Sequence, residues 1–182
     1  MNDTDTKIRT YLNKWLAKKS VATENKNILT VLKTGTKKTL KTIDDVKNIL
    51  NVELDPTISN NAVVVMNQDA FNLFDKMKDT DGNYLLEKDP TNLTKKLLLG
   101  KPVHVLSNKI LPTNAQNAPV FIGNLKEAIV LFDREQLSLL STNIGKGAFE
   151  KNLTNVRAIL RHDVKKFDAG AFVFGEISTA AA

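Results

Sequence analysis

The run AVVVMN at residues 62–67 decides how this chain folds. Its short length and its β-branched valines are typical of a buried strand rather than of a helix. Asn67 ends the run at a position where its side chain can cap a following helix. The buried face of that helix is expected at Ala70, Phe71, Phe74 and Met77. Asp81-Gly82 then predicts a turn, so a strand, a helix and a turn follow one another in this short stretch.

The rest of the chain alternates apolar runs with polar turns. Thr42 and Asp45 resemble a capping box and predict a short helix that ends before Asp55-Pro56. Surface loops are expected at 112–119 and, with a flexible backbone, at 142–147. Further strands are predicted at 103–106, 120–122, 129–132, 137–140, 156–160 and 171–174. Together these elements predict an α+β fold.

Upstream, the spacing of apolar residues predicts a long amphipathic helix over 6–32 that stops near Gly35. Its apolar stripe comprises Ile8, Tyr11, Leu12, Trp15 and Leu16. Because Trp15 lies on this stripe, we expect it to anchor either a core or an interface. The helix is unusually long for a small domain.

Composition sets the outer limits of the interpretation. A chain of 182 residues with 42% hydrophobic content can bury one good core or two small ones. It contains no cysteine, which excludes a disulfide framework or a cysteine zinc site and suggests an intracellular protein. The N-terminus is polar, and no apolar run approaches the roughly 18 residues that span a bilayer. Neither secretion nor membrane insertion is expected.

The net charge of +6 is unevenly distributed. Residues 1–50 hold 11 basic and 5 acidic residues, whereas the remainder holds 15 of each. The lysines expected to face a polyanion are Lys33, Lys37, Lys38 and Lys41. The same charges also fit a solvated helix face, so a basic DNA-binding module stays an alternative, recognisable by affinity that falls steeply with salt.

Motifs for catalysis or cofactor binding fail on their context. Gly145-Lys146-Gly147 is the only Gly-x-Gly, and the third glycine of a dinucleotide fingerprint would fall at Glu150. The two histidines, His104 and His162, lie in different predicted strands without a marked nucleophile. We therefore predict no catalytic, cofactor-binding or metal-binding residues. An enzyme would require a deep pocket that joins one histidine to carboxylates.

The order of these segments resembles the major capsid proteins of tailed bacteriophages, which have the Hong Kong 97 fold. No single motif is specific, but the motifs are collinear over nearly the whole chain. The segments that carry the resemblance are Tyr11-Leu12-Asn13-Lys14-Trp15, Val65-Met66-Asn67, Asp81-Gly82, Leu98-Leu99-Gly100-Lys101-Pro102-Val103 and the run from Gly123 to Val130.

The resemblance implies a long spine helix with strands in a peripheral domain, and a mixed sheet flanked by helices in an axial domain. Residues 1–35 would form the spine helix and 129–166 the return strands of the peripheral domain. Residues 36–128 would form the axial domain, and 167–182 its closing strand and tail. Family members also carry an N-terminal arm and an extended E-loop ahead of the spine helix, so this chain is expected to be a core fragment.

The implied function is structural and requires no enzyme activity and no cofactor. Copies would assemble into hexamers and pentamers of an icosahedral shell that encloses double-stranded DNA in a phage or prophage particle. Partners would be the chain itself, packaged DNA without sequence specificity, and portal, scaffold or decoration proteins. The protein would occupy the virion, and the bacterial cytoplasm during assembly. A host-encoded, encapsulin-like nanocompartment shell shares this fold and stays an alternative.

The resemblance also suggests which residues contact neighbouring subunits. These are Thr113, Asn114, Gln116, Asn117, Asn143, Lys146, Lys151 and Asn152. Some family members seal their shells with a Lys–Asn isopeptide bond, and Asn152 falls where such an asparagine would lie. We do not expect this bond, because the partner lysine belongs to the E-loop and an apolar residue near Ile159 replaces the assisting glutamate. A core fragment of this kind can be folded and monomeric.

Overall fold

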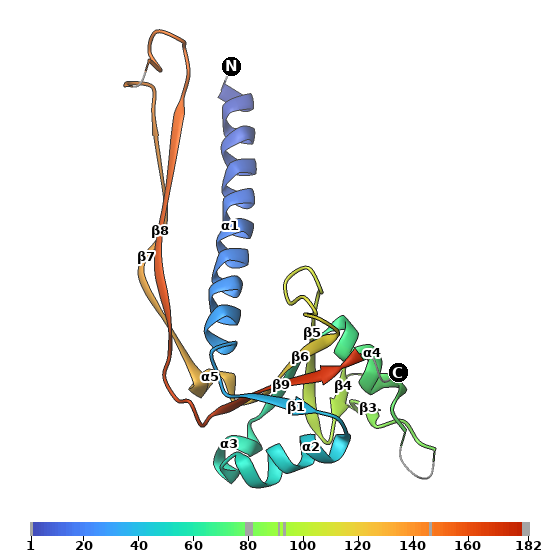
Figure 1. Ribbon diagram of the computed structural model, residues 1–182. Helices are drawn as coiled ribbons and strands as arrows, with labels where there is room; N and C mark the ends of the chain where they lie inside the picture. The colour runs from blue at the N-terminus through green and yellow to red at the C-terminus, as the bar shows by residue number, and fades with distance from the viewer. Residues whose placement is uncertain (1, 79–81, 91, 93, 146, 180–182) are drawn as a thin grey trace. The chain divides into compact units, whose positions relative to one another are not determined.

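The computed structural model describes residues 2–78, 82–90, 92, 94–145 and 147–179, and it divides into two compact units (Figure 1). Unit 1 comprises Met1–Ile28 and Leu131–Lys165, and unit 2 comprises Leu29–Val130 and Lys166–Ala182. The helices are α1 (Asn2–Leu32), α2 (Ile43–Asn48), the π-helix η1 (Ile49–Glu53), α3 (Pro56–Asn60), α4 (Gln68–Lys76) and α5 (Leu125–Ala128). The strands are β1 (Lys37–Leu40), β2 (Val63–Asn67), β3 (Leu86–Lys88), β4 (Lys96–Leu98), β5 (Lys101–Leu106), β6 (Asn117–Gly123), β7 (Ile129–Thr142), β8 (Asn155–Lys166) and β9 (Phe172–Ser178). The predicted α+β class is confirmed.

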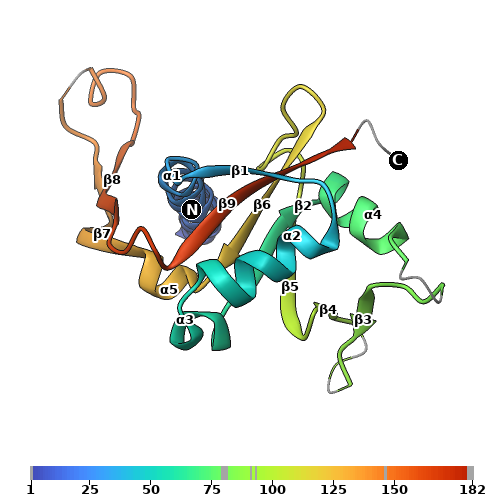
Figure 2. The ribbon, with the colours of Figure 1, turned by 60° about the horizontal axis from the view of Figure 1, so that its bottom comes forward.

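Unit 2 is built on a seven-stranded mixed sheet with the order β1-β9-β6-β2-β5-β4-β3 (Figure 2). Strand β2 lies at its centre, antiparallel to β6 and parallel to β5. The strand predicted at 62–66 is therefore confirmed with a shift of one residue. The sheet also contains β1, parallel to β9, and the short β3 and β4, which the sequence patterns did not predict.

One face of this sheet packs against helices. Val64 and Met66 of β2 are fully buried in a core that α2, η1 and α4 close with apolar side chains. Burial of each such side chain contributes about 1.5–3 kcal/mol. The core side chains from the helices include Val46, Ile49, Leu50, Ala70, Leu73 and Phe74. On α4, Phe71 and Met77 are only partly buried, whereas Leu73, which the predicted face omitted, is buried.

The opposite face holds an aromatic cluster. Phe121 of β6 and Phe174 of β9 stack with ring centroids 5.0 Å apart, and the last turn of α1 adds the buried Leu32. The chain leaves α1 at Leu32 and passes Gly35, which does not take the positive φ of a helix-terminating glycine. A Cβ at Gly35 would lie 2.8 Å from the ring of Phe172. Glycine thus allows the Phe172 ring to pack closely there, which corrects its predicted role.

Two tight turns of unit 2 have both central residues at positive φ, as in type I′ turns. The β4–β5 turn has Leu99 at +53° and Gly100 at +72°. The turn before β6 has Ala115 at +44° and Gln116 at +66°. Strand β6 already begins at Asn117, so the predicted loop at 112–119 is shorter than expected, and its last two residues are buried in the sheet.

Unit 1 consists of most of α1 and the hairpin of β7 and β8. Two strands were predicted at 129–132 and 137–140, but β7 runs unbroken over 14 residues. The polar residues between the two runs do not interrupt the strand because they include no glycine or proline. Glu135 instead pairs across the hairpin with Arg161, at 3.3 Å.

The predicted apolar stripe of α1 is divided between two environments. Leu12 and Leu16 are half-buried, but Tyr11 and Trp15 keep 69% and 47% of their surface exposed. Near the end of unit 1's helix, the Asn27 amide lies 3.0 Å from Nε2 of His162 on β8, and this hydrogen bond joins α1 to the hairpin.

Among the residues that the structure describes, no helix combines the length and apolar character that crossing a membrane requires.

Candidate subunit interfaces

The tip of the β7–β8 hairpin carries its apolar side chains outward. Ala148 is buried, and around it backbone bonds run from the Ala148 amide to Gly145 O at 3.0 Å and from the Leu153 amide to Ala148 O at 2.8 Å. Ile144, Phe149 and Leu153 are 73%, 82% and 52% exposed. An ordered turn that exposes three large apolar side chains is typical of a surface that a partner covers.

The whole of unit 1 shares this lack of burial. In the part of it that the structure describes, only Ala148 and Val164 are buried. A two-stranded hairpin is at best marginally stable alone in water, because it has too little apolar surface to bury. The other large apolar residues left exposed in this unit are Tyr11, Trp15, Val21, Leu131, Phe132, Leu140 and Val156. Unit 1 therefore depends on further surfaces for burial.

The resemblance suggested intersubunit contacts in this hairpin, and the residues that it suggested are polar. Asn143, Lys151 and Asn152 are exposed in the tip, and Lys146 lies outside the described residues. Asn152 has a φ of +50°, which suits asparagine in a turn. The sequence patterns did not indicate the three apolar residues of the tip, although apolar residues inside a polar turn were the signal that could have identified them.

The second predicted contact surface is the turn at residues 113–117 of unit 2. The Asn114 and Asn117 backbones exchange hydrogen bonds of 3.1 and 2.8 Å, which closes the turn around Ala115 and Gln116. The Thr179 amide and hydroxyl both donate to Gln116 O, at 2.7 and 2.9 Å. Side chains 114–116 are exposed, and Asn117 is half-buried at the start of β6. The turn of residues 114–117 is thus rigid and polar, and we call it the knob.

Thr113 has a role inside unit 2. Its hydroxyl donates to Asp69 and accepts a hydrogen bond from Nδ2 of Asn67 at 2.7 Å. Asp69 also accepts from the Asn108 amide at 2.9 Å. These bonds tie the segment before the knob to the first turn of α4, so the Thr113 side chain orients the knob from within the subunit.

We expect this arrangement to make unit 2 less stable in acid. Hydrogen bonds from Thr113 and then Asn108 hold the pKa of Asp69 below its ordinary value. Such a carboxylate stabilises the fold above an unfolded pKa of about 4, and the stabilisation is lost as pH falls through the folded pKa. In urea titrations between pH of about 6 and about 3, Asp69→Asn should therefore lose less unfolding free energy than the wild type.

The control for this titration is Glu87→Gln, which removes an exposed carboxylate elsewhere in unit 2. Its pH dependence should match that of the wild type. Equal acid sensitivity in wild type and Asp69→Asn would show that the Asp69 bonds do not contribute to stability.

The four lysines expected to face a polyanion do not form one patch. Lys37 pairs with Glu176 at 2.7 Å, and Lys38 pairs with Glu53. Lys37 and Lys38 are neighbours on β1, so their side chains point to opposite faces of the sheet. Lys33 is half-buried, and Lys41 is exposed beyond the strand.

The histidines were the residues on which an enzyme would have depended. His104 is exposed on β5 and lines an open groove of about 600 Å³ together with Glu127 of α5. Glu127 accepts a hydrogen bond from the Asn124 amide at 2.7 Å, and no Ser, Thr or Cys lines the groove. His162 bonds to Asn27, and its Nδ1 is buried without a partner. Within the described ranges, no three His, Asp or Glu residues cluster in a way that could hold a metal ion.

The sequence matches the phage capsid family over residues 1–177. The chain belongs to the phage capsid family. It is therefore a capsid shell protein, a structural component. A comparison with curated proteins gave no match.

Solved capsid structures share the fold of this capsid chain. The capsid of the native GTA particle superposes with a TM-score of 0.58 at 24% identity, covering 74% of this chain and 43% of the other. The holo-SrpI encapsulin of Synechococcus elongatus gives 0.65 at 11% identity, covering 94% and 66%. Mycobacterium phage Che8 gives 0.52 at 13% identity, covering 93% and 61%. This capsid chain thus spans less than half the length of the GTA capsid chain.

Proposed function

We propose that this protein is the major capsid protein of a tailed phage or prophage, whose copies form hexamers and pentamers of an icosahedral shell around double-stranded DNA. The observation that carries the proposal is unit 1, a helix and hairpin that bury almost none of their own apolar side chains. Neighbouring copies would supply the missing burial. The portal, scaffold and decoration proteins expected from the family are part of the same proposal.

The two units correspond to two proposed domains with different roles in assembly. We assign residues 1–35 and 129–166 to a peripheral domain, and 36–128 and 167–182 to an axial domain. Unit 2 has its own core, whereas the hairpin of unit 1 exposes large apolar residues along both of its strands. We therefore place the stronger subunit contacts in unit 1, and the polar contacts of Asn114 and Gln116 in the knob of unit 2.

An encapsulin-like nanocompartment shell is the second candidate. The encapsulin superposes with the higher TM-score, 0.65 against 0.58 for the GTA capsid. At 11% identity this likeness concerns the fold, which both classes of shell share. The family match favours the phage shell. Purified particles containing protein cargo and no DNA would favour the nanocompartment.

The proposal predicts that the hairpin tip drives association. Ile144→Ser, Phe149→Ser and Leu153→Ser combined should weaken self-association at least 100-fold, because each apolar side chain covered by a neighbour contributes about 1.5–3 kcal/mol. Sedimentation velocity from about 10 μM to about 1 mM would compare the two chains, and electron microscopy would show capsomers or shells.

Val52→Ser is the matched control, because Val52 is 74% exposed but lies in unit 2. Its sedimentation should equal that of the wild type. A hairpin-tip variant that sediments like the wild type, at concentrations where the wild type associates, would contradict self-association through unit 1.

A further inference from the structure

The positive charge of the protein is concentrated in unit 1. The residues of this unit include 12 basic and 7 acidic ones, whereas unit 2 has 14 and 13. Within α1, the segment from Thr6 to Thr23 contains five basic residues and no acidic residue. No carboxylate lies three or four residues along the helix from Lys14, Lys18 or Lys19.

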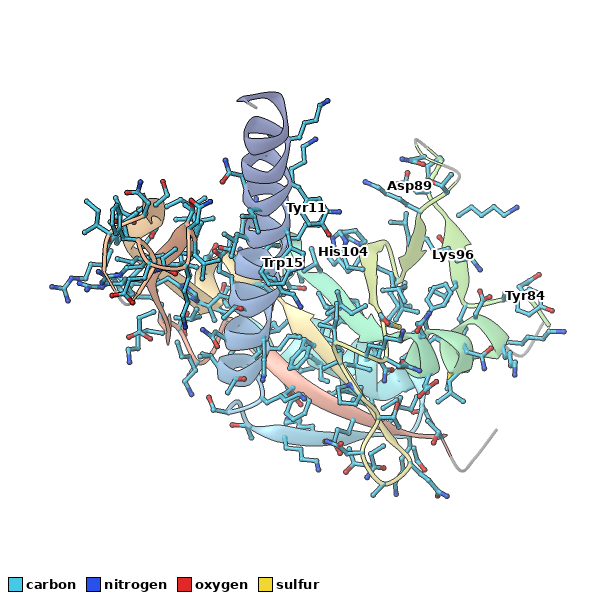
Figure 3. The ribbon with its side chains drawn as sticks, turned by 90° about the horizontal axis from the view of Figure 1, so that it is seen from above. Tyr11, Trp15, Tyr84, Asp89, Lys96 and His104 are labelled. Carbon is cyan, nitrogen blue, oxygen red and sulfur yellow. The ribbon has the colours of Figure 1, made fainter. Side chains whose placement is uncertain are left out.

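The basic residues share one side of α1 with its two aromatic residues. Helical spacing places Lys14 and Lys18 beside Tyr11, three and seven residues away. Figure 3 shows Tyr11 and Trp15 projecting from the same side of the helix. The Lys19 ammonium lies 5.6 Å from the centroid of the Trp15 ring. We call Tyr11, Lys14, Trp15, Lys18 and Lys19 the aromatic–lysine face.

This face is accessible and its lysines lack carboxylate partners. All five of its residues are exposed, and Tyr11 and Lys14 line a groove of about 290 Å³. Among the described ion pairs, none involves Lys14, Lys18 or Lys19. Glu24, further along α1, accepts a hydrogen bond from the Ser20 hydroxyl at 2.9 Å. The lysines of β1, in contrast, are paired.

We propose that the aromatic–lysine face of α1 binds the phosphate backbone of double-stranded DNA. This inference rests on the proposed function, because it identifies the surface through which the shell contacts the DNA that it encloses. From Tyr11 to Lys19 the helix extends about 12 Å, a length over which duplex DNA presents roughly seven phosphate charges. A straight helix that carries cations along one side can follow such a regular array.

The alternative occupant, an acidic segment of a second copy, is less well matched. Several carboxylates of this chain are already paired with lysine or arginine, among them Asp44, Glu53, Asp75, Glu135, Asp163 and Glu176. The acidic residues of the chain never occur as a run of more than two, so a second copy offers no long acidic segment. DNA offers about one charge per 1.7 Å of its axis, and its release of counterions favours binding at low salt.

The test measures binding of the wild-type chain to a fluorescent duplex of about 30 base pairs by anisotropy, at salt from about 50 to about 200 mM. Lys14→Gln, Lys18→Gln and Lys19→Gln combined should weaken binding at low salt at least tenfold. The slope of log K against log salt should become shallower by about 2.7, because each lost phosphate contact removes about 0.9.

The matched control is Lys88→Gln, Lys95→Gln and Lys109→Gln combined, which removes the same charge from exposed positions in unit 2. This control should keep the wild-type slope and bind within about twofold, since non-specific affinity follows the contacted phosphates. Equal loss in the two triple variants would overturn the proposal, because it would show that net charge alone attracts DNA.

Trp15 gives a second readout, because it is the only tryptophan in the chain. DNA should reduce quenching of its fluorescence by acrylamide in the wild type and in the unit 2 control. If quenching of Trp15 instead falls as the protein concentration rises, in the absence of DNA, the proposal is overturned in favour of a second copy as occupant. A hairpin-tip variant that associates as the wild type does, with DNA protection retained, would contradict the shell function and leave this face as a DNA site.

Discussion

Gly123→Ala should destabilise unit 2 by about 3–5 kcal/mol, more than any other glycine substitution that we consider. Gly123 ends β6, where it pairs with Val63 of β2 and Phe172 of β9, and its φ is +144°. A Cβ there would lie 2.3 Å from Ala171 O and 2.6 Å from the Phe172 Cα. Both atoms belong to the backbone, so the clash cannot be relieved by rotating a side chain.

The control separates the clash from the effect of a positive φ. Gly100 has a φ of +72° in the β4–β5 turn, and a Cβ there would meet nothing within 4 Å. Gly100→Ala should therefore cost only about 1–2 kcal/mol. Urea unfolding monitored by near-ultraviolet circular dichroism would compare the two. Similar costs would show that β9 can shift away from β6, contrary to the close approach that we describe.

Asn67→Ala should cost unit 2 about 2–4 kcal/mol, because one buried side chain makes three hydrogen bonds. Its Oδ1 caps α4 by accepting from the Ala70 amide at 2.9 Å. Its Nδ2 donates to Leu111 O at 3.2 Å and to the Thr113 hydroxyl at 2.7 Å. Alanine removes the cap, worth about 1 kcal/mol, and leaves a buried carbonyl unsatisfied, which costs about 1–3 kcal/mol.

Asn72→Ala is the matched control, since Asn72 is exposed on the same helix. It should change stability by no more than about 0.5 kcal/mol. An Asn67→Ala chain as stable as Asn72→Ala would mean that the segment before the knob is held by its backbone alone.

The role of Asn67 as a helix cap was predictable from sequence, but its second role was not. The apolar run before Asn67 and the helical spacing after it indicate a cap, because capping depends on residues within one turn. The bonds to Leu111 and Thr113 join segments more than 40 residues apart, and no local pattern reports them. Similarly, Leu99 and Ala115 occupy left-handed turn positions for which sequence patterns favour glycine or asparagine.

The apolar stripe of α1 shows the same limit. Helical spacing put Tyr11, Leu12, Trp15 and Leu16 on one stripe, and the structure half-buries the two leucines while leaving the two aromatic residues exposed. Spacing identifies the side of an element on which a residue lies. It does not specify which part of that side a neighbouring element covers.

The sequence by itself determined the α+β class, the central strand, the cap of α4 and the resemblance to the phage capsid family, because each depends on the local period of apolar residues or on the order of segments. The tertiary structure decided which apolar residues remain exposed in the hairpin and on α1, and which lysines are neutralised. Burial and ion pairing depend on contacts between distant segments. The pairing of Lys37 with Glu176, for example, exists only because β1 lies beside β9.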